Sequence, residues 1–503
     1  MSTTTTDPPP EPMPDANIDQ HAADAPADQG GSHRLAIAIL VLSAFVVILN
    51  ETILSVALTH LMDDLGVDEP TVQWVSTAFL LTMAVVIPTT GYLLQRLTTR
   101  ALYLAAMGLF LLGTVISAAA PGIEMLLVGR VVQACGTAIM MPMLMTTVLQ
   151  LVAPNRRGQV MGTVMIVISV APALGPTVSG VILQFLAWRW IFLIMLPIAV
   201  LMTVIGALKL PNVSEPERSR LDLLSIPLTV IGFGGLVFGL NSFGEGASSP
   251  TLWVSLALGV VGLALFVWRQ LTLQRSGTPL LDLRTFVHRP FTIGLGLIMV
   301  GFAALIGVAI LWPIYLERVH HIDPIVIGMM LLPGGLAMGL LGPVIGRLYD
   351  RLGAKVLAVP ASIALTVFLF SMSRTSEATP EWLLVALHLL MSLSLAFMFT
   401  PVFTSALNSL PPSLYSHGSA TLGALQQVAG GAGTALLVAL MAATRASQEA
   451  GGANESDATM AGIRMAVTVA AGLAAGAVVL TLMLRPGAPE ASPDGDGAPA
   501  AAH

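Results

Sequence analysis

The sequence predicts an all-α integral membrane protein that crosses the bilayer fourteen times. Three observations lead to this fold class: an apolar composition, apolar runs long enough to span a membrane, and a one-sided distribution of basic residues. Of the 503 residues, 55% are hydrophobic and 10% are charged, whereas a soluble domain carries about 25% charged residues. The mean hydropathy is +0.84. Such a chain cannot cover a water-facing surface, so we expect lipid to be its main solvent.

Fourteen apolar runs have about the length that a helix needs to cross the hydrocarbon core, which is roughly 20 residues. The shortest of them is the eighth. The predicted spans are 35–58, 73–94, 101–120, 124–149, 160–186, 189–208, 223–241, 252–268, 291–315, 325–346, 355–372, 381–404, 418–442 and 461–484.

The basic residues give the orientation of the chain. With both termini inside, the inner segments hold sixteen of the 22 Lys and Arg residues and the outer segments hold four, while Arg130 and Arg464 fall within spans. Loops on the cytoplasmic side carry the positive excess. The sequence therefore predicts a multi-pass protein of the inner (plasma) membrane with both termini in the cytoplasm. Leaving out any one span would scramble this partition, so the partition also supports the count.

The predicted domain organisation has two six-span bundles with two additional spans between them. The tails are rich in Pro, Ala and Asp and are expected to be disordered. A single cysteine, Cys135, rules out a disulfide within the chain. The predicted segments are a tail at 1–33, a bundle at 34–210, the additional spans at 211–275, a second bundle with its preceding cytoplasmic segment at 276–485, and a tail at 486–503.

An internal repeat supports the division into halves. Gly91-Tyr-Leu-Leu-Gln95-Arg96-Leu-Thr98-Thr-Arg100 follows span 2, and Gly346-Arg-Leu-Tyr-Asp350-Arg351-Leu-Gly353-Ala-Lys355 follows span 10. Both segments fit the pattern G-x-L-x-[D/Q]-R-x-x-x-[R/K], so they are expected to mark equivalent points of two related bundles. Membrane proteins built from such repeats bind their ligands near the midplane, between the repeats.

The second of these segments resembles the signature loop of the major facilitator superfamily, G-x-L-x-D-R-x-G-x-[RK], at every defined position. The resemblance implies two six-helix bundles around a central cavity. It also implies that Asp350 and Arg351 latch neighbouring helices on the cytoplasmic side, with Gly346 and Gly353 in the loop. The first copy retains Gly91 and Arg96 but has Gln95 and Thr98 in place of the acid and the glycine, so its latch is expected to be weaker or to use another acid.

Further motifs resemble the fourteen-span drug–proton antiporter branch of this superfamily, the EmrB/QacA type. In span 4, Leu126, Arg130, Gln133 and Gly136 fit L-x-x-x-R-x-x-Q-x-x-G. The segment Leu49-Asn50-Glu51-Thr52-Ile53-Leu54-Ser55-Val56-Ala57-Leu58 resembles the signature that this branch carries in span 1. The family usually has Asp at the position of Asn50. The segments Pro279-Leu-Leu-Asp282-Leu-Arg284 and His417-Gly418-Ser-Ala, followed by Gln426 and Gln427, also fit.

Span 5 resembles the motif that marks antiporters within the superfamily, with Pro172, Gly175, Pro176 and Gly180 at its defined positions. Gly175-Pro176 is expected to break or bend the helix, because proline lacks a backbone donor and clashes with the preceding turn. Gly175 and Gly180 would allow neighbouring helices to approach closely. The resemblance implies a seal against uncoupled leakage; simple helix packing is the alternative.

Glu51 and Arg130 are the predicted proton-coupling pair. A charge in the hydrocarbon region costs about 2.5–3.5 kcal/mol on insertion scales, so an ionisable residue there is a functional candidate. Glu51 is the only acid well inside a predicted span, and Arg130 lies at a similar depth. A carboxylate beside an arginine ionises easily, whereas an isolated one in apolar surroundings holds its proton. A distance that changes between conformations would let Glu51 bind and release a proton. A static ion pair between spans 1 and 4 is the alternative.

Other polar side chains within spans are candidates for the proton path or the substrate cavity. His388 in span 12 is an imidazole that can exchange a proton near neutral pH, or a structural histidine. Asn50, Gln133, Gln426 and Gln427 can hydrogen-bond a substrate or join helices. Met141 belongs to a methionine-rich stretch of span 4 that suits a cavity accepting varied shapes, or merely fills gaps between helices.

The sequence lacks the motifs of the main rival classes. No G-x-x-x-x-G-K-[ST] loop is present, nor any G-x-S-x-G, H-E-x-x-H or paired-Cys motif, which argues against ATP-driven transport and against a membrane enzyme. No cofactor, metal or nucleic-acid partner is expected, and the protein is expected to be a monomer. We predict a proton-coupled exporter of small amphipathic compounds that works by alternating access. A dedicated metabolite or lipid transporter of the same fold is the alternative.

Overall fold

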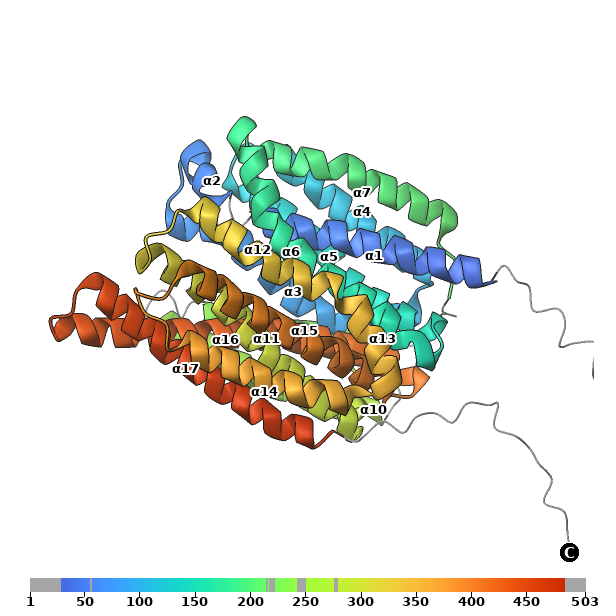
Figure 1. Ribbon diagram of the computed structural model, residues 1–503. Coiled ribbons are helices and arrows are strands. Elements are labelled where there is room, and N and C mark those ends of the chain that lie inside the picture. The colour runs from blue at the N-terminus through green and yellow to red at the C-terminus, as the bar shows by residue number, and fades with distance from the viewer. Residues whose placement is uncertain are drawn as a thin grey trace, which may run out of the picture.

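The computed structural model describes residues 29–54, 57–213, 216, 222–241, 250–275 and 279–484, and every regular element in this part of the chain is helical (Figure 1). The predicted tails lie outside the described residues, except that 29–33 form the first turns of α1. The long helices are α1 (Gln29–Ile53), α3 (Glu69–Arg96), α4 (Thr99–Ala118), α5 (Ile123–Leu151), α6 (Arg157–Phe185), α7 (Arg189–Lys209), α10 (Pro250–Gln274), α11 (Arg289–Arg318), α14 (Ala354–Met372), α15 (Glu381–Asn408), α16 (Tyr415–Ala450) and α17 (Glu455–Leu482).

Twelve helical segments of the described chain are long and apolar enough to cross a membrane. They correspond to all the predicted spans except the seventh and the tenth. The tenth matches α12 (Pro324–Leu340) and α13 (Gly342–Leu352), which are bent by 41° relative to each other and make a thirteenth crossing if they count as one span. The bend falls where Pro343 occupies the first turn of α13, because proline cannot continue the hydrogen bonds of the preceding helix.

The seventh predicted span corresponds to a shorter apolar segment, Ser225–Leu240. It consists of α8 (Ser225–Thr229), a π-helical turn at Val230–Gly234, and α9 (Gly235–Asn241). The segment runs antiparallel to α10, with Gly232 against Leu263 and Gly239 against Leu256. We call α8, the π-helical turn, α9 and α10 together the extra pair. Because Ser225–Leu240 is short, the count of fourteen spans stays a prediction.

The helices before residue 210 pack mainly on one another, and so do those after residue 289. In Figure 1 the first group (blue to green) and the second group (yellow to red) lie one above the other, and α6 and α12 meet at the boundary between them. The remaining contacts between the halves are made by α13 with α6, α16 with α3 and α5, and α15 with α6. α1 begins and α17 ends at the same end of the molecule, which we call the inner end.

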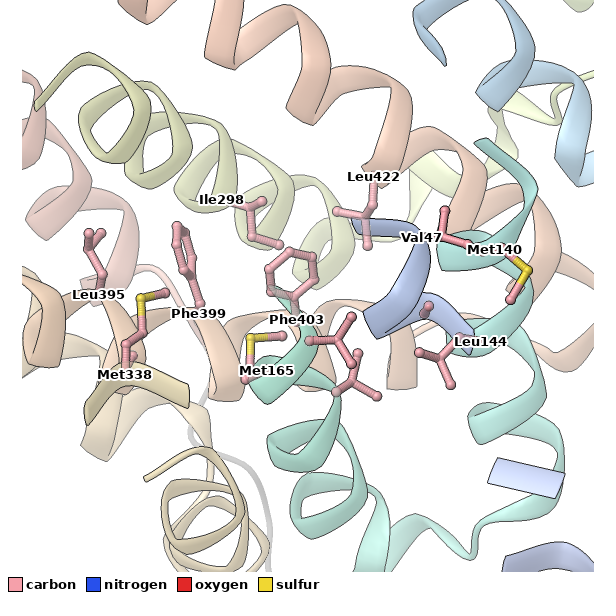
Figure 2. Packing of buried hydrophobic residues seen from close by; sticks show 14 of the residues in the cluster. Val47, Met140, Leu144, Met165, Ile298, Met338, Leu395, Phe399, Phe403 and Leu422 are labelled. Atoms are coloured by element: carbon pink, nitrogen blue, oxygen red, sulfur yellow. The ribbon is translucent and has the colours of Figure 1, made fainter. Parts of the chain in front are cut away.

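The largest hydrophobic cluster runs through both halves (Figure 2). A second cluster joins the extra pair to α3, α5 and α16. It contains Phe79, Ala134, Phe233, Phe266 and Ala420 among others. Residues of the first cluster labelled in Figure 2 are Val47 of α1, Met140 and Leu144 of α5, Met165 of α6, Ile298 of α11, Met338 of α12, Leu395, Phe399 and Phe403 of α15, and Leu422 of α16.

The structure is closed at its inner end. All side-chain hydrogen bonds that it gives between residues 34–210 and 279–484 lie near that end; an example is the bond from the Thr146 hydroxyl to Ser419 Oγ, 3.2 Å. Toward the other end, which we call the outer end, a Cβ added at Gly180 of α6 or at Gly328 of α12 would meet no atom within 4 Å.

Candidate functional site

Glu51 lies in the last turn of α1, which ends at Ile53. The predicted span continued to residue 58, so Glu51 is closer to the helix end than the sequence predicted. Its side chain is partly buried. The adjacent Thr52 ties this turn to α6: its hydroxyl donates to the Ala171 carbonyl at 3.4 Å, and its side chain fills the space that a Cβ at Gly175 would need. Glu51 therefore sits beside the helix that makes most of the contacts between the halves.

Arg130 of α5 is almost completely buried, with 1% of its surface exposed. Its guanidinium lies 3.9 Å from the centre of the Phe79 ring and donates to the Val75 carbonyl at 3.4 Å, so two residues of α3 hold it. It also donates to Gln133 Oε1 at 2.6 Å, and Gln133 Nε2 in turn donates to Thr114 Oγ1 of α4 at 2.9 Å. This network fixes the position of the arginine without using a carboxylate.

The structure does not contain the static ion pair between Glu51 and Arg130 that was one interpretation of the sequence. Among the described residues no salt bridge joins them, although α1 packs against α5 and the charge of Arg130 reaches Glu51. In this conformation the two predicted partners are electrostatic neighbours that make no contact.

His388 of α15 lies within the second half, at the α12–α15 packing. Its ring is 2.8 Å from the position that a Cβ on Gly334 of α12 would occupy, and its Nδ1 has no hydrogen-bond partner among the described residues. The Ser392 hydroxyl donates to the His388 main-chain carbonyl at 2.9 Å, and this hydrogen bond does not involve the imidazole ring. His388 is therefore on a different helix pair from Glu51 and Arg130.

The predicted cavity residues differ in their surroundings. Gln133 is completely buried. Its amide oxygen accepts from Arg130 and its amide nitrogen donates to Thr114, so it supports the arginine in this conformation. Asn50 is 1% exposed, and neither of its amide atoms has a partner among the described residues. Met141 is partly buried against the main hydrophobic cluster, and Gln426 and Gln427 of α16 are partly buried.

The antiporter-type residues of α6 behave differently from one another. The helix is continuous from Arg157 to Phe185 through Pro172 and Pro176, so of the predicted break or bend the break is absent, and the bend stays a prediction. Gly175 does permit close approach, since a Cβ there would overlap the Thr52 side chain. Gly180 has no neighbour within 4 Å of such a Cβ, so the close approach expected at Gly180 is wrong for this conformation.

The second signature segment joins the halves at the inner end. The carboxylate of Asp350 accepts hydrogen bonds from the main-chain N–H groups of Gly158 (2.8 Å) and Gln159 (2.9 Å), at the start of α6. A carboxylate at a helix N-terminus satisfies free donors and complements the helix dipole. Gly346 is required because a Cβ there would overlap the Gly158 carbonyl, and Gly353 ends α13 with a φ of 78°, a left-handed value that favours glycine.

The first signature segment makes a different contact. Gly91 of α3 lies against His417 of α16, and Gln95 Nε2 donates to the Ser413 carbonyl at 3.3 Å. Thr98, which replaces the family's glycine, caps α4 by accepting a hydrogen bond from the Ala101 N–H. The two signature arginines, Arg96 and Arg351, are exposed.

Sequence reasoning missed a buried arginine at the same end. Arg157 is 7% exposed and donates to the Leu149 and Val152 carbonyls at the end of α5. It also donates to Asn408 Oδ1 (2.9 Å) and to the Tyr415 hydroxyl (3.2 Å), which belong to the other half. Its neighbour Arg156 is exposed, and the sequence contains no signal that separates the two.

These helices, their halves and the signature contacts agree with the comparison with known proteins. Residues 40–434 match the profile of the Major Facilitator Superfamily. The chain belongs to the major facilitator superfamily. It is therefore a membrane transporter rather than an enzyme, and its fold class was predicted correctly.

Three relatives of this major facilitator protein carry informative names. The uncharacterized MFS-type transporter YcnB of Bacillus subtilis is 40% identical over 452 residues, which are 89% of this chain and 94% of YcnB. The lincomycin resistance protein LmrB of B. subtilis is 40% identical over 407 residues, 80% of this chain and 84% of LmrB. A multidrug resistance protein B homolog of Mycobacterium tuberculosis is 30% identical over 408 residues, 80% and 75% of the two chains.

Solved structures show the same fold. The human organic anion transporter MFSD10 (TETRAN) superimposes with a TM-score of 0.62 at 16% identity and covers 89% of this chain and 99% of its own. The proton:xylose symporter XylE gives a TM-score of 0.62 at 12% identity, with 91% and 97% covered.

Proposed function

We propose that this transporter is a proton-coupled exporter of small amphipathic compounds, of the fourteen-span drug–proton antiporter branch. It would act in the inner membrane with its inner end toward the cytoplasm. The names of two relatives, a lincomycin resistance protein and a multidrug resistance protein homolog, support drug export. The proton coupling is our inference from Glu51 and its surroundings.

The observation that carries the coupling is the position of Glu51 between a cation fixed by hydrogen bonds and the interface between the two halves. Arg130 is held by α3, α4 and its own helix, so its charge stays in place. Glu51 is attached through Thr52 to α6, which packs on α12, α13 and α15 of the other half. A movement of α6 relative to α5, which carries Arg130, would change the separation of carboxylate and guanidinium, and with it the proton affinity of Glu51.

The transport cycle then follows from alternating access. In the inner-closed conformation Glu51 makes no ion pair, and it takes a proton from the outer side as substrate leaves. In the inner-open conformation a closer Arg130 favours the carboxylate, so the proton is released inside and a substrate binds. Asn50, with two unpartnered amide atoms next to Glu51, is a candidate to hydrogen-bond that substrate.

The first prediction tests this coupling in inverted vesicles that hold a proton gradient reported by a pH-sensitive dye. Lincomycin and a panel of neutral and cationic amphipathic drugs are added in turn. We expect an active compound to dissipate the gradient with wild type and to have no effect with Glu51→Gln, which has the same size and cannot exchange a proton. Glu124→Gln is the matched control, because Glu124 is an exposed acid at the start of α5.

Two outcomes would contradict the proposal. A response of Glu51→Gln equal to that of wild type would remove Glu51 from the coupling step and make His388 the next candidate. A wild type that inserts correctly and responds to none of the compounds would reject the substrate class, in favour of a dedicated metabolite or lipid transporter.

A further inference from the structure

Two seams close the inner end, and they are built from equivalent helices with different chemistry. In the α6–α13 seam, Gly158 and Gly346 touch through their main chains and Asp350 caps α6. In the α3–α16 seam, a Cβ on Gly91 would lie 2.9 Å from His417 Nδ1, and Gln95 donates a hydrogen bond to the Ser413 carbonyl. The α3–α16 seam therefore has no carboxylate from its own signature segment.

A buried carboxylate reaches the α3–α16 seam from elsewhere. Asp282 lies on the connection between α10 and α11 and is 2% exposed. It forms a 2.5 Å ion pair with Arg284, accepts from Gln274 Nε2 at 3.0 Å, and interacts electrostatically with His417. Burial alone would raise the pKa of Asp282, but the hydrogen bonds and charge of Arg284, with a smaller contribution from His417, hold that pKa below its usual value. Asp282 is therefore an ionised group.

His417 is the residue of α16 on which the charge of this carboxylate acts. It is 3% exposed, and its Nδ1 has no hydrogen-bond partner among the described residues. The charged groups that act on it are Asp282 and Arg284, and from α3 it meets the uncharged Gly91. A buried polar atom without a partner is costly, and the negative charge of Asp282 is the charge acting on this ring that favours its protonated form.

The extra pair fixes the position of the connection that carries Asp282. Gln270 of α10 is completely buried; its Oε1 accepts from the N–H groups of Leu280 (2.8 Å) and Leu281 (3.2 Å), and its Nε2 donates to Ser225 Oγ at the start of α8 (2.7 Å). Leu280 and Leu281 belong to the second hydrophobic cluster, which contains residues of both α3 and α16. The connection that carries Asp282 is thus fixed to the extra pair and packed across the seam.

The extra pair also contacts both halves along its length. Trp74 of α3 stacks on Phe238 of α9 with ring centres 5.6 Å apart, and Leu240 of α9 lies 3.7 Å from the position of a Cβ on Gly431 of α16. Because α3 belongs to one half and α16 to the other, opening of the inner end must change these contacts.

We propose that Asp282 is a positioning residue that supplies the acid missing from the first signature segment, and that through it the extra pair holds the α3–α16 seam closed. The extra pair is thereby a brace that shifts the conformational equilibrium toward the inner-closed state. This gives the two additional spans a role in gating, independent of which substrate or ion is carried.

The second prediction measures inner opening directly. In a Cys135→Ser background, which removes the single native cysteine, Met165→Cys places a reporter on α6 beside Gly342 of α13, away from the brace. Its alkylation by a membrane-impermeant maleimide is followed in inverted vesicles. We expect Asp282→Asn to raise the alkylation rate about fivefold, the lower end of typical coupling between two states.

The matched control is Asp64→Asn. Asp64, in the short helix α2 (Leu58–Leu65), is also an aspartate in an arginine ion pair, with Arg189 at 3.0 Å, but its partners Trp188 and Arg189 lie in the first half, away from the extra pair. We expect it to leave the alkylation rate at the wild-type value. A second variant, Gln270→Leu, releases the connection without touching the charge and should also raise the rate. It keeps the test decisive if Asp282→Asn folds poorly.

A double-mutant cycle separates the brace from simple support of the local fold. If Asp282 acts through His417, then His417→Asn should raise the rate as Asp282→Asn does, and the double variant should add nothing further. The proposal fails if the effects of the two substitutions are additive, or if neither Asp282→Asn nor Gln270→Leu increases alkylation. Neither result depends on proton coupling at Glu51, so the outcome is distinguishable from that of the vesicle experiment above.

Discussion

Arg130 depends for its orientation on a glutamine one turn further along the same helix. Gln133 accepts from the guanidinium and donates to Thr114, and all three side chains are buried. Hydrogen bonds to charged groups contribute about 1.5–3 kcal/mol, and a buried partner left unsatisfied adds its own desolvation cost. Gln133 is thus the link through which α4 fixes the charge that acts on Glu51.

The third prediction follows from this link. Gln133→Leu preserves approximate size but removes one hydrogen bond from Arg130 and one from Thr114, so we expect it to destabilise the protein by about 2 kcal/mol. Thermal unfolding in detergent measures the change. Gln426→Leu is the matched control, since Gln426 has no hydrogen bond given among the described residues and is only partly buried. Equal melting temperatures for Gln133→Leu and wild type would contradict the role assigned to this network.

The sequence was sufficient to single out the charged residues of the site but not their contacts. Glu51 and Arg130 are conspicuous because charges within spans are rare. That Arg130 turns toward Gln133 and α3, and that Arg157 rather than Arg156 is buried, depends on the packing of helices far apart in the chain. One-dimensional spacing contains no information on such choices, and for the same reason the sequence left open whether Gln133 contacts substrate or joins helices.

At the scale of single elements, the α6–α13 seam requires glycine on both helices. A Cβ at Gly346 would overlap the Gly158 carbonyl, and one at Gly342 would overlap the Gly162 carbonyl. Main-chain contact of this kind brings Asp350 within reach of the first N–H groups of α6. The signature pattern predicted a latch at this point. The bend between α12 and α13 was not predicted, although Pro343 is a local signal for it, and the π-helical turn before α9 was not predicted either.

The fourth prediction concerns this seam. Gly346→Ala inserts one methyl group where no space exists, and such overpacking typically costs about 1–3 kcal/mol. Because the strain exists only while the seam is closed, we expect faster alkylation of the Met165→Cys reporter from the inner side, together with weaker export. Gly328→Ala is the matched control, since a Cβ there meets no atom within 4 Å. If both alanine variants are alkylated at the wild-type rate, the seam is not what keeps the inner end closed.

For the molecule as a whole, hydropathy was enough to predict an all-α protein with many membrane-spanning helices, because a bilayer requires long apolar runs of any chain that spans it. The orientation inferred from the excess of basic residues on one side stays a prediction. The closed state is not predictable in this way. It depends on a few contacts at the inner end, which alternating access must make and break. The hydropathy and charge patterns belong to the sequence and are the same in either conformation, so they cannot distinguish the two.

The fifth prediction concerns Ser225–Leu240, the segment on which the count of fourteen depends. At a rise of about 1.5 Å per residue it measures roughly 24 Å, against a hydrocarbon core of about 30 Å. If it crosses the membrane, the residues that flank it lie on opposite sides.

In the Cys135→Ser background, Thr251→Cys at the start of α10 should react with an impermeant maleimide on intact cells, as should the outer reference Glu124→Cys. Leu223→Cys, whose parent side chain is 71% exposed, should react only in inverted vesicles. Labelling of Thr251→Cys and Leu223→Cys from the same side would mean that the segment is re-entrant. The two termini would then lie on opposite sides of the membrane, and the distribution of basic residues would lose the asymmetry that supports fourteen spans.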